Sequence, residues 1–310
     1  MKQFTKVGDV PGVEALVSEA LRFKSSPLHD IGKGKTLGLF FFNPSLRTRL
    51  STQKAALNLG MNCIVMNAGS ESWRLEMADG TVMDGDSQEH VKDAVAVMSA
   101  YCDIIGVRTF PKLESAAEDY TEPVLNAFLK YSEVPVVSLE SATRHPLQSL
   151  ADLVTIRELG LRKPKIAVTW APHPKVLPQA VTNSFLEWVK TIEAEVVLAH
   201  PEGYCLHPEF SEGIPITHRQ EEALEGAGIV YCKNWSSFEH YGQRPPVAEN
   251  WTVTADKMRL TNHAKFMHCL PIRRNVVATG EVVDNSIVLQ QAANREWAAQ
   301  AVLGRLIGVE

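Results

Sequence analysis

The sequence predicts an α/β protein with two lobes, each built on a mainly parallel sheet flanked by helices. Segments typical of strands alternate with segments typical of helices along most of the chain, which is the order of βα units in a parallel sheet. A long amphipathic helical pattern over residues 148–159 separates two such alternating regions. The length of 310 residues also fits two domains of roughly 150 residues each. We therefore expect a ligand site in a cleft between the lobes.

The first lobe is predicted from the residues before 148. Short, largely apolar runs predict strands at 36–42, 63–66, 104–107 and 134–139. Helices are expected at 47–59, 93–101 and 123–130. The first of these helices is followed by Gly60, a residue that commonly closes helices.

The second lobe repeats the alternation. Strands are expected at 165–170, 195–200, 229–233 and 266–270, and helices at 178–189 and 219–225. A final helix is expected at 292–307, and its pattern alone allows it to pack on either lobe.

Composition argues against several classes of partner. Lys and Arg total 31 against 36 for Asp and Glu, a net charge of −5, so nucleic-acid binding is not expected. The five cysteines contain no C-x-x-C pair, which fits a reducing cytoplasm. The N-terminus lacks the apolar core of a signal peptide, and the best apolar stretch, 94–107, is interrupted by Asp103. We expect a soluble cytoplasmic protein without a membrane partner.

An anion site is predicted at residues 43–49, Asn-Pro-Ser-Leu-Arg-Thr-Arg, between a predicted strand and a predicted helix. Backbone N–H groups at a helix N-terminus bind anions, and here hydroxyls and two guanidiniums, Arg47 and Arg49, accompany them. A lone S-x-R is more often an N-cap serine beside solvated arginines. The strand-to-helix position favours a phosphate site, although the segment is neither a P-loop nor a G-x-G-x-x-G fingerprint.

Two further clusters follow predicted strands. Residues 143–148, Thr-Arg-His-Pro-Leu-Gln, and Arg108 should lie at the carboxyl edge of the first sheet, where open α/β folds bind ligands. A His, an Arg and a Thr hydroxyl there would stabilise an oxyanion on a carbonyl group, although His145 alone would more often be structural. In the third cluster, 268–274, Cys269 next to His268 suggests a nucleophile, but adjacent strand residues face opposite sides, so we expect a positioning role.

Together, Ser45-x-Arg47-Thr48-Arg49, His145-Pro146-x-Gln148 and His268-Cys269-Leu270-Pro271 resemble, in order and spacing, the signature of the aspartate/ornithine carbamoyltransferase superfamily. The resemblance implies a carbamoyl-phosphate-binding domain over 1–147, an amino-acid-binding domain over 148–290, and a C-terminal helix over 291–310 that packs back on the first domain. It also implies a homotrimer with active sites shared between subunits, and no metal or organic cofactor.

Within the superfamily, the chain lacks the Ser-Met-Gly motif with which ornithine enzymes hold a free α-amino group, so free ornithine is not the expected substrate. Residues 71–73, 83–86 with 89–90, and 169–174 resemble the N-acylornithine branch instead. That resemblance implies a knot in the second lobe, at the proline-rich loop after Trp170, and the entry of Trp73 into a neighbouring subunit's site.

The acyl group is predicted from fewer residues. Acetyl-specific members carry Glu at the position of Gln88 and Lys at that of Val277, whereas succinyl-specific members carry Pro and an apolar residue. A Glu would repel the second carboxylate of a succinyl group, and neutral Gln88 would not. His173, Lys233 and Arg273 supply groups that could bind that carboxylate. We expect N-succinyl-L-ornithine as substrate, with N-acetyl-L-ornithine as the alternative.

The resemblance implies that the unprotonated δ-amine attacks the carbonyl carbon of carbamoyl phosphate, in the pathway of arginine biosynthesis. The carbamoyl-phosphate contacts that it implies are Ser45, Leu46, Arg47, Thr48, Trp73, Arg108, His145, Gln148, Cys269, Leu270 and Arg295, of which Thr48, Arg108, His145 and Cys269 are the expected catalytic residues. The implied N-acylornithine contacts are Gln88, Glu140, His173, Asn183, Lys233 and Arg273. For Glu140 and Asn183 a structural role is the competing interpretation, because such residues are common at strand ends and in helices.

Two other classes of function are alternatives to the carbamoyltransferase hypothesis. A non-catalytic sensor of carbamoyl phosphate or an amino acid need not retain all three motif clusters, and this chain has them all. An RNA-binding or RNA-modifying protein would need a basic stripe that the chain lacks.

Overall fold

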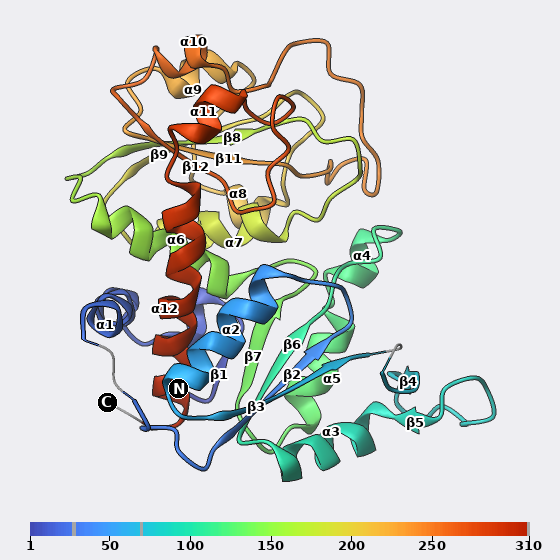
Figure 1. Ribbon diagram of the computed structural model, residues 1–310. Helices are drawn as coiled ribbons and strands as arrows, with labels where there is room; N and C mark the ends of the chain where they lie inside the picture. Colours follow the sequence, from blue (N-terminus) through green and yellow to red (C-terminus); the bar gives the residue numbers. More distant parts are fainter. Residues whose placement is uncertain (27–28, 69–70, 309–310) are drawn as a thin grey trace. The chain divides into compact units, whose positions relative to one another are not determined.

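The computed structural model describes residues 1–26, 29–68 and 71–308 (Figure 1). These residues form two compact units. The first is drawn from Met1–Lys112, Ala117–Leu150 and Arg295–Glu310, and the second from Leu113–Ala116 and Ala151–Asn294. Each unit contains a five-stranded parallel sheet with helices, which confirms the predicted α/β class. The units change at 150/151 and 294/295, whereas the sequence placed domain boundaries after 147 and 290.

The first unit is built on a sheet with the strand order β1-β7-β6-β2-β3, all neighbours being parallel. Its strands are β1 (Gln3–Phe4), β2 (Thr36–Phe41), β3 (Asn62–Asn67), β6 (Ile104–Arg108) and β7 (Val136–Glu140), with the short pair β4 (Leu75–Glu76) and β5 (Glu89–His90) outside the sheet. Its helices are the 3₁₀ turn η1 (Val7–Asp9), α1 (Val13–Ser25), α2 (Arg47–Asn58), α3 (Val91–Tyr101) and α5 (Pro123–Tyr131), and the short α4 (Ala116–Asp119) lies at the border between the units.

The strands β2, β6 and β7 are buried along nearly their whole length. Successive strand residues point to opposite sides, so the sheet is covered on both faces at these strands. On one face, Phe40 and Ile105 pack against Phe128 of α5 and Val95 of α3. On the other face, a separate apolar layer joins the sheet to α2, to α6 (Pro146–Glu158) and to α12 (Val288–Leu306). It consists of Leu37, Leu39, Gly106, Val137, Leu139, Thr52, Leu147, Ala299, Val302 and Leu303. A parallel sheet covered on both sides explains the nearly unbroken apolar runs of β2 and β6.

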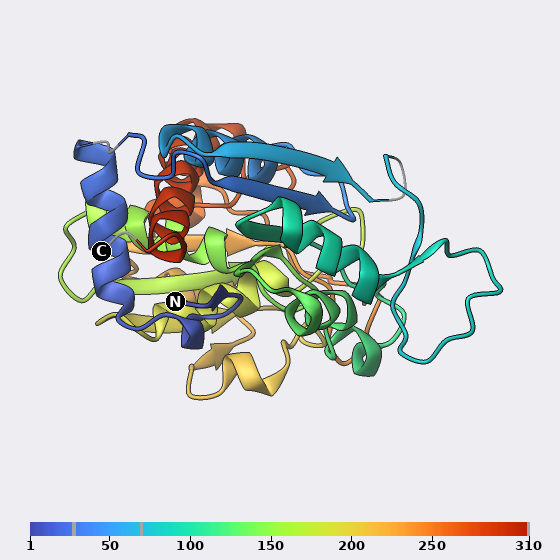
Figure 2. The same cartoon turned by 90° about the horizontal axis from the view of Figure 1, so that it is seen from below.

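The C-terminal helix α12 (Val288–Leu306) ends in the first unit. Its last turns lie beside α1 (Figure 2), where the Arg305 guanidinium bonds the Glu19 carboxylate at 2.5 Å and Gly304 faces Phe23. Helix α1 itself was missing from the sequence prediction. Its buried Leu16, Val17, Ala20 and Phe23 follow helical spacing, which is the signal that would have predicted it.

The second unit has the parallel strand order β10-β9-β8-β11-β12. Its strands are β8 (Lys165–Trp170), β9 (Glu195–Ala199), β10 (Ile216–Thr217), β11 (Ile229–Lys233) and β12 (Lys265–Met267). Its helices are α7 (Ala180–Val189), α8 (Pro208–Ser211), α9 (Gln220–Leu224), α10 (Ala255–Met258) and α11 (Gly280–Asp284). Within the described ranges, no helix is long and apolar enough to cross a membrane.

The central helix α6 (Pro146–Glu158) corrects the prediction of an amphipathic helix at 148–159. Residues 147–156 are buried on every side. The polar residues among them have partners distant in sequence: the Asp152 carboxylate accepts hydrogen bonds from the Tyr231 hydroxyl at 2.8 Å and from Gln291 Nε2 at 2.7 Å. Such partners make burial of polar groups tolerable, and a pattern confined to one helix does not reveal them.

Replacement of Tyr231 by Phe should lower the free energy of unfolding by about 1–3 kcal/mol, because a buried hydrogen bond to Asp152 is lost while the ring still stacks on Phe185. Urea-unfolding curves of wild type and Tyr231→Phe measure the difference. Tyr101→Phe, at an exposed tyrosine, is the control and should change the value by less than about 0.5 kcal/mol. Equal stability of the two variants would contradict the role of the buried bond.

Candidate functional site

The turn between β2 and α2 carries the residues of the predicted anion site. The Ser45 hydroxyl oxygen accepts a hydrogen bond from the Thr48 N–H at 3.3 Å, which caps the first turn of α2. The turn lines a hollow of about 600 Å³ together with the ends of β2 and β3. Ser45 and Leu46 both line this hollow, and Arg47 is the first residue of α2. A helix N-terminus at the edge of an open hollow has the geometry of an anion site.

Arg49 was predicted as a guanidinium of the anion site, but its side chain is engaged by other residues of the first unit. Its side chain lines the hollow, but its guanidinium donates to Asn67 Oδ1 and stacks over the Phe41 ring at 5.0 Å. The Asn67 N–H in turn donates to Glu71 at 2.7 Å, and this hydrogen bond is the main reason why the pKa of Glu71 is lowered. Arg49 therefore ties α2 to the end of β3.

Arg108 lies buried at the carboxyl end of β6 and supports the same turn. Its Nη1 donates to the carbonyl oxygens of Asn43 at 2.9 Å and Pro44 at 2.5 Å, and its Nη2 donates to Glu140 Oε2 at 2.9 Å. Glu140 ends β7, so this buried ion pair joins two strand ends. The register shift between Val107 and Arg108 against β7 brings Arg108 opposite Glu140.

Arg295 is the centre of the polar cluster in the first unit. Its Nη2 donates to the Thr48 hydroxyl oxygen at 2.8 Å, and its Nη1 donates to Gln148 Oε1 and to His145 Nε2, the latter at 3.2 Å. A guanidinium can only donate, so His145 Nε2 is an acceptor and the ring is neutral with its proton on Nδ1. The Thr48 oxygen accepts from Arg295, so the hydroxyl hydrogen of Thr48 can serve another acceptor.

The cluster is continuous with the pair described above, since His145 Nε2 lies 3.6 Å from Glu140 Oε2. The structure therefore brings together six of the predicted residues, five from different helices and strands and one, His145, from the loop before α6: Thr48, Arg108, Glu140, His145, Gln148 and Arg295. Several buried donors converge on one edge of the sheet, an arrangement suited to holding a phosphate and a polarised carbonyl.

Trp73 and Gln88 lie close in sequence to the short strands β4 and β5, which are in a segment that extends away from the main sheet of the first unit (Figures 1 and 2). Trp73 is 55% exposed and its indole N–H donates to Glu89 at 2.7 Å. The Gln88 side chain is also exposed. The base of the loop is fixed by Asp79, which accepts hydrogen bonds from Lys130 and Tyr131 of α5. No contact within the described ranges joins Trp73 or Gln88 to the Arg295 cluster.

The second unit gathers a basic cluster, which we define as His173, Lys233, Arg244 and Arg273. Arg273 Nε donates to His173 Nε2 at 3.1 Å, and Arg244 donates to the His173 carbonyl oxygen. Burial of the ring, and then the positive charges of Arg273, Lys233 and Arg244, lower the pKa of His173 below its ordinary value. His173 is therefore neutral among three permanent cations, a setting suited to carboxylates.

Arg244 was not among the predicted residues. It lies in the long segment between β11 and α10, where no motif or periodic pattern marks it. Its proximity to His173, 71 positions earlier in the chain, is a product of the fold alone.

The segment after β12 differs from the prediction of a strand at 266–270. Strand β12 ends at Met267, so Cys269 and Leu270 lie beyond it, and the Leu270–Pro271 peptide bond is cis. The alternation argument against a His268–Cys269 dyad therefore does not apply, but the contacts of the imidazole explain its role. Asn234 Nδ2 donates to two backbone carbonyls, so Asn234 Oδ1 is the acceptor for His268 Nε2 at 3.3 Å.

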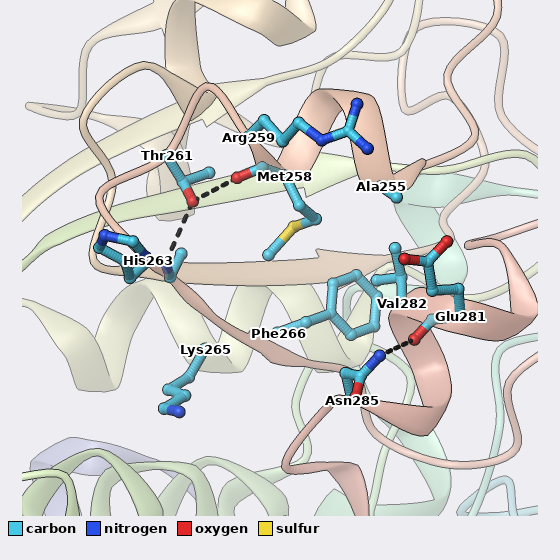
Figure 3. A pocket seen from close by; sticks show the side chains of 11 residues that line it. Ala255, Met258, Arg259, Thr261, His263, Lys265, Phe266, Glu281, Val282 and Asn285 are labelled. Carbon is cyan, nitrogen blue, oxygen red and sulfur yellow. Dashed lines mark hydrogen bonds between the residues drawn. The ribbon is translucent and has the colours of Figure 1, made fainter.

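The remaining predicted residue, Asn183, is fully buried in α7. A separate hollow of about 540 Å³ lies near α10 and α11 (Figure 3) and contains none of the predicted residues. Of its charged side chains, Arg259 is paired with Asp256. Among the described residues, no three His, Cys, Asp or Glu side chains gather as metal ligands.

Comparison with known families gives one match in the N-terminal half of the chain and one in the C-terminal half. A family model described as the aspartate/ornithine carbamoyltransferase carbamoyl-P binding domain matches residues 2–158, and one described as the Asp/Orn binding domain matches residues 178–306.

Relatives are similar over nearly the whole chain. N-succinylornithine carbamoyltransferase of Bacteroides fragilis (strain 638R) is 49% identical over 99% of each chain. N-acetylornithine carbamoyltransferase of Xanthomonas campestris pv. campestris is 37% identical over 96% of this chain and 94% of its own. A crystal structure of acetylornithine transcarbamylase complexed with acetylcitrulline has a TM-score of 0.93 at 36% identity, covering 99% of this chain and 100% of that chain. A mutant of N-acetyl-L-ornithine transcarbamylase complexed with carbamyl phosphate and N-succinyl-L-norvaline has a TM-score of 0.92, also at 36% identity with the same coverage.

The basic cluster predicts how His173 titrates. Its pKa should lie below the ordinary histidine value, and Arg273→Gln should raise it, because one of the positive charges that disfavour the imidazolium is removed. Titration of the His173 ring by NMR measures both values. The control Arg274→Gln removes a neighbouring charge that is paired with Asp284 at 2.7 Å and should leave the pKa of His173 unchanged. An equal response to both substitutions would contradict the assigned geometry.

Proposed function

Because this chain belongs to the aspartate/ornithine carbamoyltransferase family, we propose that it transfers the carbamoyl group of carbamoyl phosphate to the δ-amine of N-succinyl-L-ornithine. The products are N-succinyl-L-citrulline and phosphate. The observation that carries the proposal is the Arg295 cluster, in which Thr48, His145 and Gln148 meet one guanidinium at the sheet edge. The proposed place of the reaction is arginine biosynthesis in the cytoplasm.

On the carbamoyl-phosphate side, the phosphate group binds at the N-terminus of α2, held by Ser45, the Leu46 backbone, Arg47 and Thr48. The donor groups of Thr48, Arg108 and His145 polarise the carbonyl oxygen. Gln148 and the backbone at Cys269 and Leu270 hold the carbamoyl NH₂. These residues orient the carbonyl carbon for attack, and orientation supplies much of the rate enhancement when no covalent intermediate is formed.

The chemical step balances without any further reactant. The lone pair of the neutral δ-amine forms the new C–N bond, and the bond from the carbonyl carbon to the phosphate oxygen breaks. The leaving phosphate gains negative charge, which Arg47 and the helix N-terminus stabilise, and it takes the proton released by the amine. The acyl-ornithine is held by Glu140, Asn183, Lys233, Arg273 and His173, with Gln88 near the acyl group.

Three observations support the succinyl group over the acetyl group. The basic cluster offers several cations to a substrate that has two carboxylates. Gln88 carries no charge that would repel the second carboxylate. Relatives 49% identical to this chain are named as N-succinylornithine carbamoyltransferases, whereas those named as N-acetylornithine carbamoyltransferases are 36–37% identical. N-acetyl-L-ornithine is the second candidate because a solved structure with a TM-score of 0.93 to this chain is that of an acetylornithine transcarbamylase complexed with acetylcitrulline.

We also propose a homotrimer with shared sites and a knotted second domain. Supporting self-association, α2 presents Leu50 at 58% and Leu57 at 62% exposure, and Ile64 of the edge strand β3 is exposed nearby in the first unit. Exposed apolar side chains of this kind mark interaction surfaces. The exposed Trp73 loop would then complete the site of the neighbouring subunit.

Citrulline-derivative formation from carbamoyl phosphate should be measured with N-succinyl-L-ornithine, N-acetyl-L-ornithine and free L-ornithine side by side. We expect kcat/KM to be at least about tenfold higher for the succinyl compound than for the acetyl compound, since a charged hydrogen-bonded contact contributes about this much. Preference for the acetyl compound would overturn the succinyl proposal but not carbamoyl transfer. Failure with all three amines would overturn the reaction itself.

Shared sites predict complementation between two inactive variants. Arg47→Ala and Trp73→Ala should each lose at least about a hundredfold in kcat/KM for carbamoyl phosphate, because one loses phosphate charge and the other a contact from the neighbour. Random mixed trimers should regain about a quarter of wild-type activity, because one site in four combines an intact Arg47 with an intact neighbouring Trp73. The control mixture, Arg47→Ala with His145→Ala, should regain none, because both residues come from the same chain. Equal behaviour of the two mixtures would count against shared sites.

A further inference from the structure

Arg244 has no role in the reaction proposed above. It lies on the segment between β11 and α10, and its guanidinium reaches the loop after β8, where it donates to the His173 carbonyl oxygen. The side chain is exposed. One N–H group is engaged with the carbonyl, and an arginine has five such donors in a planar fork, so a second acceptor can still be bound.

His173 separates Arg244 from Arg273. The backbone oxygen of His173 accepts from Arg244, and the imidazole Nε2 of the same residue accepts from Arg273 at 3.1 Å. The two guanidiniums are therefore held on two sides of one uncharged residue. Lys233, at the end of β11, is close enough to act electrostatically on the same ring.

The charges of this cluster have no acidic partner in the part of the chain that the structure describes. Among the described residues, no Asp or Glu forms an ion pair with Lys233, Arg244 or Arg273, whereas the adjacent Arg274 is paired with Asp284 at 2.7 Å. Three like charges brought together repel one another, so the arrangement is favourable only when anionic groups bind there. A ligand with a single carboxylate neutralises less of this charge than a ligand with two.

We propose that Arg244 is a specificity-determining residue that binds the distal carboxylate of a dicarboxylic N-acyl group, while Lys233 and Arg273 bind the α-carboxylate of the amino acid. This inference rests on the proposed function and goes beyond it, because it assigns the choice between a charged and an uncharged acyl end to one exposed arginine. Guanidinium–carboxylate pairs can be bidentate, which gives the geometric selectivity that such a choice requires.

The test compares substrates that differ only at the acyl end. N-succinyl-L-ornithine, its neutral N-succinamoyl analogue and N-acetyl-L-ornithine are assayed with saturating carbamoyl phosphate, using wild type, Arg244→Gln and Arg244→Lys. For Arg244→Gln, the ratio of kcat/KM for the succinyl compound to that for the succinamoyl compound should fall at least about tenfold, mainly through KM. Arg244→Lys should recover part of the loss, because it keeps the charge but not the fork.

Arg274→Gln is the matched control, because it removes the same charge from the same surface at a paired arginine. It should leave the substrate ratio unchanged. If Arg244→Gln lowers kcat/KM for all three substrates by the same factor, Arg244 only holds the His173 loop and the inference is overturned while the proposed function stands. If wild type does not carbamoylate the succinyl compound, both fail together.

Discussion

The buried Arg295 guanidinium is the interaction on which the first unit depends. Its three acceptors come from the start of α2, the end of the β7 loop and the first turn of α6, and each would be left without this donor if the C-terminal helix did not return. A buried charge must be surrounded by hydrogen-bonding groups. The chain end and the predicted phosphate site are therefore stabilised by the same contacts.

In the second unit, the uncharged side-chain amide of Asn234 joins strand ends by hydrogen bonds, as the Arg295 guanidinium joins elements of the first unit. Asn234 follows β11, donates to the carbonyls of Ala171 and Pro172 after β8, and accepts from His268 after β12. Three loops at the carboxyl edge of one parallel sheet are thereby fixed to a single amide. His268 is thereby connected through Asn234 to the backbone just before His173 and just after Lys233.

Much of the fold could be predicted from sequence because parallel strands buried on both faces leave apolar runs such as β2 and β6. Helix α1 was predictable from the spacing of Leu16, Ala20 and Phe23 and was missed. The burial of α6 on every side was not predictable, because the hydrogen-bond partners of its Asp152 lie far along the chain, at Tyr231 and Gln291. In the candidate site, too, some residues could be predicted from the sequence and others could not. Motifs indicate Ser45, Thr48 and His145, whereas nothing in the sequence brings Arg244 to His173.

The two groups of residues proposed to bind anions also differ in a way that bears on specificity. Arg108 and Arg295 are buried and have several acceptors each, so a substitution near either would leave charged groups without partners. Arg244 and Arg273 are exposed and make few contacts, so they can be exchanged at little cost to folding. A phosphate donor common to a whole family is best held by the first kind of residue. An acceptor that differs between branches is best selected by the second kind, because its replacement changes the substrate and leaves the sheet edge intact.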